Sequence, residues 1–284
     1  MKKIIPFTIL SLSFFAYAFD WPQENVTKDS FYSYFSQLRG GTISSSLIFS
    51  ESSSIHASDS GVILIKFDEH DDDMGWFESP LGNTVIIQHE DSFSTVYANL
   101  DEETIPETLS GKVEKGVFLG QSGNSSWQDG SSALEFQVLD SKNHYAVNPR
   151  ILLPWTNEEL KIQITGTTLV SREEKAFDAK KAPKVPTGTF RIFKDRQESV
   201  VPFRTNIKVN GASIEDITTD ILYPQKGRLC IKGNSFYPSD EFYPDEKKQL
   251  LGIVQITKGR NEIVITQSDI IGNTKAETYI VEAN

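Results

Sequence analysis

The sequence predicts an all-β protein in which a β-sheet domain is followed by an antiparallel β-sandwich, with one short helix near the N-terminus. Short runs of β-branched and aromatic residues recur along most of the chain, and glycine, proline and acidic turn residues separate them. After the first 18 residues, no run reaches the length of about 18 apolar residues that a membrane span needs. With 284 residues, the chain is long enough for two domains of ordinary size.

Residues 1–18 predict a secretory signal peptide. Two lysines near the start precede an apolar segment that ends in Ala16-Tyr17-Ala18, which is a small-residue cleavage pattern. We therefore expect the mature chain to begin at Phe19 and to be exported, to the periplasm or elsewhere in the cell envelope. An uncleaved N-terminal anchor is the alternative.

Residues 19–40 are expected to form the short helix. Phe31, Tyr34, Phe35 and Leu38 recur at spacings of three and four, after a potential cap, and two glycines follow. Such a helix would cover an edge of the first domain.

The first domain is expected to span residues 41–154. Residues 83–88 and 93–97 predict a hairpin, because two β-branched runs flank a polar turn. Residues 133–138 predict a strand with one apolar face, since apolar and other residues alternate there. Its core face would carry Leu134, Phe136 and Val138, and its other face Ala133, Glu135 and Gln137.

Several ordered segments of this domain resemble the lysostaphin/LytM-type zinc endopeptidases. The resemblance covers about residues 40 to 154, and it implies the LytM-type fold, a duplicated hybrid motif built of β-sheet. Its segments are Gly-Asn-Thr-Val-Ile-Ile-Gln-His (82–89), Thr-Val-Tyr-Ala-Asn-Leu (95–100), Val-Glu-Lys-Gly-Val-Phe-Leu-Gly (113–120), Leu-Glu-Phe-Gln-Val (134–138) and Val-Asn-Pro (147–149).

The same resemblance implies that the active site has been lost. The family cleaves peptide cross-bridges of peptidoglycan with one zinc ion, which is held by histidine and aspartate. By the family's spacing, the metal-binding and catalytic positions fall on Thr42, Ser46, Asn99, Ala133 and Glu135. Only Glu135 could still ligate a metal, whereas a catalytic zinc normally needs three protein ligands. We therefore expect no metal and no cofactor, with zinc present only if the chain is an active enzyme.

Three functions are compatible with these residues. The leading hypothesis is an exported, catalytically inactive relative that binds peptidoglycan or regulates a cell-wall amidase or other hydrolase. One alternative is an active zinc metalloendopeptidase with a rearranged site, and another is a structural or adhesive envelope protein that acts through its C-terminal domain. For the leading hypothesis, the candidate residues of a binding groove are Tyr97, Asn99, Trp127 and Glu135.

Other potential metal ligands favour structural roles. The acidic run at residues 68–73 is expected to be a solvated loop, because Gly82 stands where an EF-hand needs a bidentate glutamate. The four histidines, His56, His70, His89 and His144, show no metal-ligand spacing.

The rest of the chain is divided into a linker and a second domain. Residues 155–188 are expected to be a linker, with a possible strand at 161–170 and an exposed segment at 171–184. Residues 189–284 predict an immunoglobulin-like β-sandwich, in which Asn210-Gly211 forms a hairpin turn. Its strands are expected at 190–193, 203–209, 227–232, 252–257, 262–266 and 277–281.

The charge of the chain bounds its partners. The formal net charge is −11 at pH 7, and a negative surface repels nucleic acid and anionic lipid at long range. Neither is therefore expected as a partner. A single cysteine excludes an intrachain disulfide, so packed cores must stabilise both domains.

Overall fold

The computed structural model describes residues 18–67, 79–126, 133–181 and 184–284. Nearly all of its regular structure is β-strand, which confirms the predicted all-β class. The acidic run at 68–73 and Trp127 lie outside the described residues, as does most of the segment expected to be a signal peptide. In the described part of the chain, no helix is long and apolar enough to cross a membrane.

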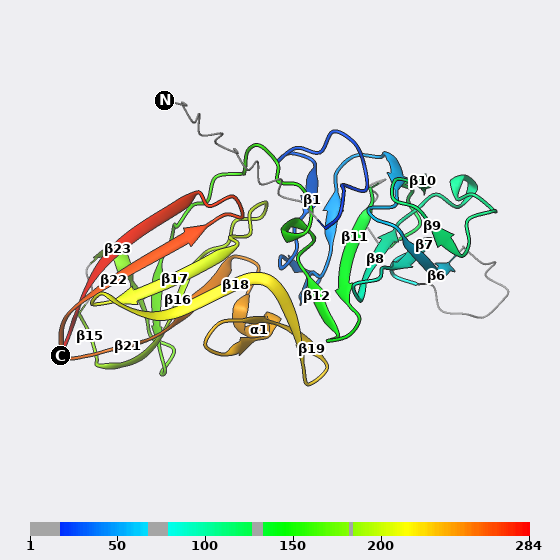
Figure 1. The fold of residues 1–284 in the computed structure, drawn as a ribbon. Coiled ribbons are helices and arrows are strands. Elements are labelled where there is room, and N and C mark those ends of the chain that lie inside the picture. Colours follow the sequence, from blue (N-terminus) through cyan, green and yellow to red (C-terminus); the bar gives the residue numbers. More distant parts are fainter. Residues whose placement is uncertain (1–17, 68–78, 127–132, 182–183) are drawn as a thin grey trace, which may run out of the picture.

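The N-terminal region, residues 18–154, is built around one antiparallel sheet (Figure 1). The predicted hairpin is confirmed, since β7 pairs with β8 and β8 then pairs with β11. Two single-turn 3-10 helices, Glu102–Thr104 and Pro149–Ile151, complete the region. Its strands are β1 (Phe31–Ser33), β2 (Leu38–Arg39), β3 (Thr42–Ile43), β4 (Leu47–Phe49), β5 (Ser54–His56), β6 (Gly61–Phe67), β7 (Thr84–Gln88), β8 (Phe93–Ala98), β9 (Lys112–Val113), β10 (Phe118–Gln121), β11 (Glu135–Asp140) and β12 (Tyr145–Val147).

The helix expected within residues 19–40 is wrong. Phe31 begins strand β1, which pairs with β4, and Ser36 has a positive φ of 67°, which a right-handed helix does not allow. The aromatic residues also face two different cores. Phe31 and Tyr34 pack in the core of the N-terminal region, whereas Phe35 packs in a second cluster at the junction with the rest of the chain. A spacing of three and four therefore did not mark one helical face.

The C-terminal region, residues 155–284, consists of two sheets that enclose a common core. One sheet has the order β14-β13-β16-β21, and strands of the other, including β17, β22 and β23, pack against it through buried aliphatic side chains. This arrangement agrees with the expected β-sandwich. The strands are β13 (Thr168–Ser171), β14 (Ala176–Asp178), β15 (Lys184–Val185), β16 (Gly188–Asp195), β17 (Arg204–Val209), β18 (Ala212–Gln225), β19 (Arg228–Lys232), β20 (Phe236–Tyr237), β21 (Lys248–Ile256), β22 (Gly259–Ser268) and β23 (Thr274–Ala283).

The segment expected to be a linker contributes strands to this region. The possible strand at 161–170 is confirmed only at its end, since β13 begins at Thr168 and pairs with both β14 and β16. Residues 176–178 thus form a strand where we expected an exposed loop, followed by a 3-10 helix at Ala179–Lys181. The one described α-helix is α1 (Ser239–Phe242), far from the N-terminus. The domain boundaries and the immunoglobulin-like character stay predictions.

A continuous sheet joins the two regions. Strand β12 pairs with β11 on one side and with β18 on the other, so the sheet runs from β6 and β9 to β23 and β15 (Figure 1). A third hydrophobic cluster lies at this junction and combines Phe35 and Ala146 with Leu222 and Tyr243. Backbone pairing and apolar packing therefore both hold the regions together.

Candidate functional site

Strand β11 presents the two faces that its sequence predicts. Leu134 and the alternate residues Phe136 and Val138 are fully buried in the core of the N-terminal region. The intervening residues Glu135, Gln137 and Leu139 therefore share the opposite face, because successive side chains of a strand alternate. The candidate site is built on this second face.

Glu135 is the centre of a polar cluster that we call the Glu135 cluster: Arg39, Ser46, Glu135 and Gln137. The Glu135 side chain is nearly buried, and Arg39 Nη1 lies 3.0 Å from its Oε2. The Ser46 hydroxyl donates to Glu135 Oε1. The Gln137 amide donates to Ser46 Oγ at 3.0 Å and to Glu135 Oε1 at 3.3 Å. Both carboxylate oxygens are thus engaged by side chains of the chain itself.

A tight hairpin carries Arg39 to this carboxylate. Strands β2 and β3 pair through Arg39 and Thr42, and the Thr42 hydroxyl donates to the Arg39 carbonyl at 2.9 Å. The turn between them is Gly40-Gly41, with φ of 54° and 77°, which glycine adopts without a Cβ penalty. Thr42 itself is exposed, and its hydroxyl is engaged by this bond within the hairpin.

Asn99 and Ala133 lie beside the Glu135 cluster, and the hydrogen bond between them stabilises the fold. Asn99 is fully buried, with φ of 63°. Its amide nitrogen donates to the carbonyl of Gly123 at 3.0 Å and to that of Ala133, and its amide oxygen accepts from the Ser126 N–H at 2.9 Å. The side chain therefore fastens the loop at 123–126 to the start of β11.

Tyr97 belongs to the core rather than to a surface. Its ring is fully buried and packs against Phe136 with ring centroids 5.3 Å apart. The Tyr97 hydroxyl accepts from the Ser58 N–H at 2.7 Å and from the Thr95 hydroxyl at 3.1 Å. Burial raises the pKa of this hydroxyl. Substituting Tyr97 would thus change the fold before it changed a binding surface.

The residues at the family's metal positions do not fit a zinc ion. They offer one carboxylate, which Arg39 already neutralises, together with serine and threonine hydroxyls that are poor ligands compared with histidine or thiolate. In the described part of the chain, no group of three or more His, Cys, Asp or Glu side chains could hold a metal ion.

The described histidines have structural neighbours. His89 is buried, with Nδ1 2.8 Å from the Ser60 carbonyl and Nε2 2.8 Å from the Thr95 hydroxyl. His56 stacks edge-on against Phe118, and His144 lies in a turn with φ of 60°. His70 lies outside the described residues.

An open pocket continues from the Glu135 cluster along the same face of β11, and we call it the β11 pocket. It has a volume of about 380 Å³ and is mainly apolar. Leu139 of β11 lines it, as do Ser45, which precedes Ser46, and Leu229 of β19. The remaining lining residues are Asp140, Ser141, His144, Tyr145 and Ala146.

Aromatic rings extend this pocket across the junction between the regions. Tyr145 stacks on Tyr223 with centroids 4.8 Å apart, and Tyr223 stacks on Phe236 at 5.6 Å. The Lys232 ammonium lies 5.2 Å from the centre of the Tyr223 ring. Phe236 is 41% exposed, so this row of rings reaches the surface. Sequence reasoning missed this row of rings because its three members come from three separate strands.

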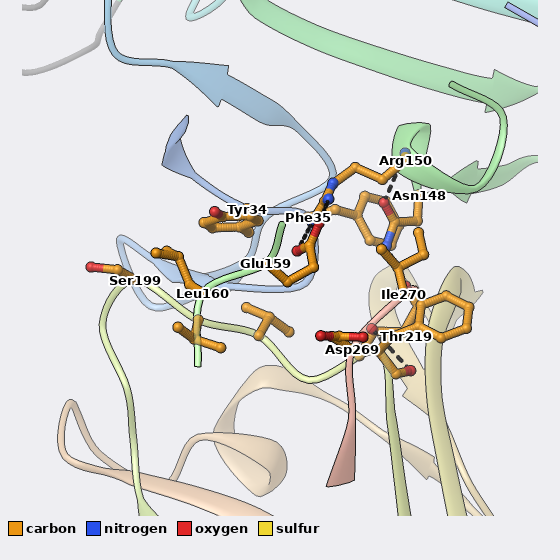
Figure 2. Close-up of a pocket in the computed structure, with 13 residues that line it drawn as sticks. Tyr34, Phe35, Asn148, Arg150, Glu159, Leu160, Ser199, Thr219, Asp269 and Ile270 are labelled. Carbon is orange, nitrogen blue, oxygen red and sulfur yellow. Dashed lines mark hydrogen bonds and ion pairs between the residues drawn. The ribbon is translucent and has the colours of Figure 1, made fainter. Parts of the chain in front are cut away.

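A second hollow at the junction is filled by a buried ion pair (Figure 2). Arg150 forms a bidentate pair with Glu159, at 2.9 Å for Nη1–Oε2, and its guanidinium lies over the Phe31 and Tyr34 rings. The cavity beside them has a volume of about 30 Å³, which is room for about one water molecule. Asn148 donates to the Thr219 carbonyl at 2.9 Å across the same junction. The polar groups around this cavity therefore hold the two regions together, and its volume leaves no room for a ligand much larger than water.

Comparison with known proteins defines the class of the N-terminal region. Residues 45–149 match the model of Peptidase family M23, and a second family model, which carries no description, matches residues 161–284. The chain thus contains an M23-family domain, which confirms the resemblance to the LytM-type proteins.

The chain is similar to one relative by sequence and to two solved structures. An uncharacterized protein of Treponema pallidum (strain Nichols) is 32% identical over 120 residues, which are 39% of this chain and 79% of the relative, and the chain belongs to the same family as that protein. A zinc-containing peptidase from Vibrio cholerae is 18% identical at a TM-score of 0.36, over 46% of this chain and 39% of that one. The deep-sea M23 metalloprotease pseudoalterin is 17% identical at a TM-score of 0.31, over 46% and 81%.

Proposed function

We propose that this protein is an exported cell-envelope protein whose M23-family domain does not hydrolyse peptide bonds but binds peptidoglycan or a cell-wall hydrolase. The observation that carries the proposal is the Glu135 cluster. The only carboxylate at the family's metal positions is satisfied by Arg39, Ser46 and Gln137. A charged guanidinium beside it opposes the approach of a second cation.

The chemistry of the neighbouring position supports the same proposal. In the family, zinc lowers the pKa of a bound water to about 7, and a nearby histidine assists with proton transfer. Here Asn99 stands at one histidine position, and its amide cannot accept a proton near neutral pH. Its nitrogen and oxygen are also both engaged by backbone groups. A general base contributes roughly 10² to 10⁴ in rate, so its loss adds to the loss of the metal.

The β11 pocket offers a surface for binding instead. Small-ligand sites are typically concave and mainly apolar, with a few polar groups that fix orientation. The pocket has this composition, with Asp140, Ser141 and His144 beside its apolar wall. The row of Tyr145, Tyr223 and Phe236 adds rings with one apolar face and, for the tyrosines, a polar hydroxyl. Such a surface suits a sugar–peptide polymer or a peptide segment of a partner enzyme.

The proposal is tested by sedimentation with purified sacculi from the source bacterium, using the mature chain. We expect wild-type protein to sediment with the sacculi, and Tyr145→Ala to weaken retention about tenfold, because one ring contact contributes on the order of 1.4 kcal/mol. Tyr32→Ala is the matched control, since Tyr32 is 53% exposed and does not line the β11 pocket.

A second arm tests the partner enzyme. Purified amidases of the same bacterium are assayed on sacculi with wild-type or Tyr145→Ala protein, and release of soluble fragments is measured. Stimulation by the wild type that Tyr145→Ala reduces supports the regulatory form of the proposal. Failure of retention together with no effect on any amidase would contradict it, and metal-dependent release of muropeptides by the chain alone would favour the enzyme alternative.

A further inference from the structure

Three aromatic rings lie in a row on one face of the sheet that joins the two regions, and we call them the aromatic row: Tyr145, Tyr223 and Phe236. Tyr223 stands opposite Cys230 of β19, and Phe236 stands opposite Lys232 of the same strand. Because alternate residues of a strand point to the same side, Lys232 lies on the same face as these rings. The other face of β18 and β19 packs into the hydrophobic cluster at the junction. The aromatic row is therefore on the outer face of this sheet.

The two tyrosine hydroxyls of the aromatic row are available to a ligand. Within the described part of the chain, neither the Tyr145 nor the Tyr223 hydroxyl forms a hydrogen bond with another protein group. By contrast, the buried hydroxyls of Tyr237 and Tyr243 donate to protein acceptors at 2.6 and 2.8 Å. Burial raises the pKa of the Tyr223 hydroxyl, so this group keeps its proton and remains a donor at neutral pH.

Lys232 adds a cationic donor beside the rings. Its ammonium lies 5.2 Å from the centre of the Tyr223 ring and 6.0 Å from that of the Phe236 ring. It forms no ion pair with the described residues, whereas Arg228 of the same strand pairs with Asp240. The aromatic row thus combines apolar ring surfaces with hydroxyl and ammonium groups that can bond a polar ligand.

This composition matches the chemistry of a carbohydrate. One face of a sugar ring is lined with C–H groups, which pack against aromatic rings, and the hydroxyls at its edge both donate and accept hydrogen bonds. Neighbouring rings of the row have centroids 4.8 and 5.6 Å apart, and their planes differ by 58° and 60°. A row that turns at each step can contact a single chain of sugars, whose linkages rotate, but not a flat surface of packed chains.

Two other classes of ligand are disfavoured. An extended peptide that adds as a strand needs a free backbone edge, but at the aromatic row β18 pairs with β12 on one side and with β19 on the other. Rings beside a lysine also suit single-stranded nucleic acid, but the net charge of −11 repels phosphates at long range. Neither objection applies to a neutral glycan.

We propose that the aromatic row is a glycan-binding site, in which the rings of Tyr145, Tyr223 and Phe236 contact successive sugars of one chain. The tyrosine hydroxyls and the Lys232 ammonium bond the sugar hydroxyls. The inference rests on the proposed function, because it assigns the sugar chain of peptidoglycan, rather than its peptides, as the part that this protein binds. Since Tyr145 belongs to the N-terminal region and the other two rings to the C-terminal region, the site needs both regions.

The experiment titrates the full mature chain, isotopically labelled for NMR, with three soluble probes. These are the β-linked tetramer of N-acetylglucosamine, its monomer, and an acetylated tetrapeptide amide of alanine. Chemical-shift changes measure each Kd and locate the site. We expect the tetramer to bind at least about tenfold more tightly than the monomer, because several rings contact it at once, and to shift the amides of residues 145, 223 and 236. The alanine peptide should bind at least about tenfold more weakly than the tetramer.

Three variants sharpen the test. Phe236→Ala is expected to weaken binding of the tetramer about tenfold, because one ring contact is lost, and Phe236 is 41% exposed, so the fold is retained. Tyr223→Phe keeps the ring and removes the hydroxyl, so it should weaken binding about threefold. Tyr32→Ala is the control and should leave the Kd unchanged, since this exposed aromatic residue lies on β1.

Several outcomes would overturn the inference. Equal affinity for tetramer and monomer, no binding of the tetramer, or an unchanged Kd in Phe236→Ala would refute it. Tighter binding of the alanine peptide at the aromatic row would assign the site to peptides instead. Sedimentation of the chain with sacculi, without binding of the tetramer, would refute this inference and leave the proposed function standing. Binding of the tetramer at the row without sedimentation would support the inference and contradict retention on sacculi.

Discussion

Two buried charges, one in each region, are stabilised in different ways. Glu135 of the N-terminal region faces the guanidinium of Arg39, so charge meets opposite charge. Lys194 of the C-terminal region is fully buried, and its ammonium donates to the Gln163 carbonyl and the Gln267 side-chain oxygen, each at 2.9 Å. Burial lowers the pKa of Lys194 to about 8, and nearby Asp195 opposes this only in part.

The two buried charges differ in how the loss of their hydration is compensated. Neutral acceptors satisfy the hydrogen bonds of Lys194 but do not offset the loss of hydration. Burying the charged ammonium therefore still reduces the stability of the fold. At Glu135 a cation from a separate hairpin compensates the carboxylate. In our account this guanidinium serves where the active members of the family use a metal ion. The N-terminal region thus holds a buried carboxylate at one of the family's metal positions, with an arginine beside it.

The largest expected effect comes from substituting Asn99, a neutral buried residue beside the Arg39–Glu135 ion pair. Asn99→Ala removes hydrogen bonds to Gly123, Ala133 and Ser126 and places alanine at a positive φ. We expect the free energy of unfolding to fall by about 3 kcal/mol, measured by urea unfolding. Asn143→Ala, at an exposed turn, is the control and should change it by less than about 0.5 kcal/mol. A loss below about 1 kcal/mol for Asn99→Ala would show that Asn99 does not fasten this loop.

A smaller effect is expected when the ion pair between Arg39 and Glu135 is broken. Arg39→Met leaves the Glu135 carboxylate buried beside Ser46 and Gln137 without its cation. We expect a loss of about 2 kcal/mol, because Arg39 is partly exposed and water replaces some of the interaction. Arg39→Lys should restore part of the loss, since it keeps the charge but not the planar fork. Equal stability of Arg39→Met and the wild type would contradict the role of the guanidinium.

The smallest effect is a pH dependence that belongs to the C-terminal region. Because the pKa of Lys194 is about 8 in the folded chain and 10.5 ordinarily, the unfolded chain binds more protons between these values. Stability should therefore rise with pH through this window, by about 1 to 2 kcal/mol between pH 7 and 9.5.

Lys194→Met provides the control for that measurement. The variant should lack this rise, whereas Arg39→Met should retain it. The range stops at pH 9.5 because burial raises the pKa of Tyr34 to about 12, and a raised tyrosine pKa makes stability fall as pH increases above about 10. A rise of equal size in Lys194→Met would assign it to another group.

Local patterns predicted most of the longer strands of the fold, because alternation and turn residues are local signals. The hairpin of β7 and β8 and the two faces of β11 followed from them. Strand β18 did not, since its inward positions include Glu215, whose carboxylate accepts from the Tyr237 hydroxyl at 2.6 Å and from the Asn234 N–H at 2.7 Å. A buried charge satisfied by distant residues cannot be recognised from a local pattern.

The candidate site was predictable only in part for the same reason. The family resemblance pointed to Ser46 and Glu135, which the structure brings together. It did not point to Arg39, which contacts Glu135 across 96 positions of sequence. It also suggested Asn99 and Tyr97 as groove residues. Both are fully buried in the structure, and this burial depends on the tertiary arrangement of the loops around them, which the local sequence does not give. Which of these positions bind a ligand stays a prediction.

The zinc content of the purified mature chain, expressed without a metal-binding tag and measured by elemental mass spectrometry, tests the central claim most directly. Our account predicts a folded protein with well below one zinc ion per chain after dialysis against zinc-free buffer, unchanged in Glu135→Gln. One tightly held zinc per chain that Glu135→Gln removes would contradict it and would restore the metallopeptidase alternative.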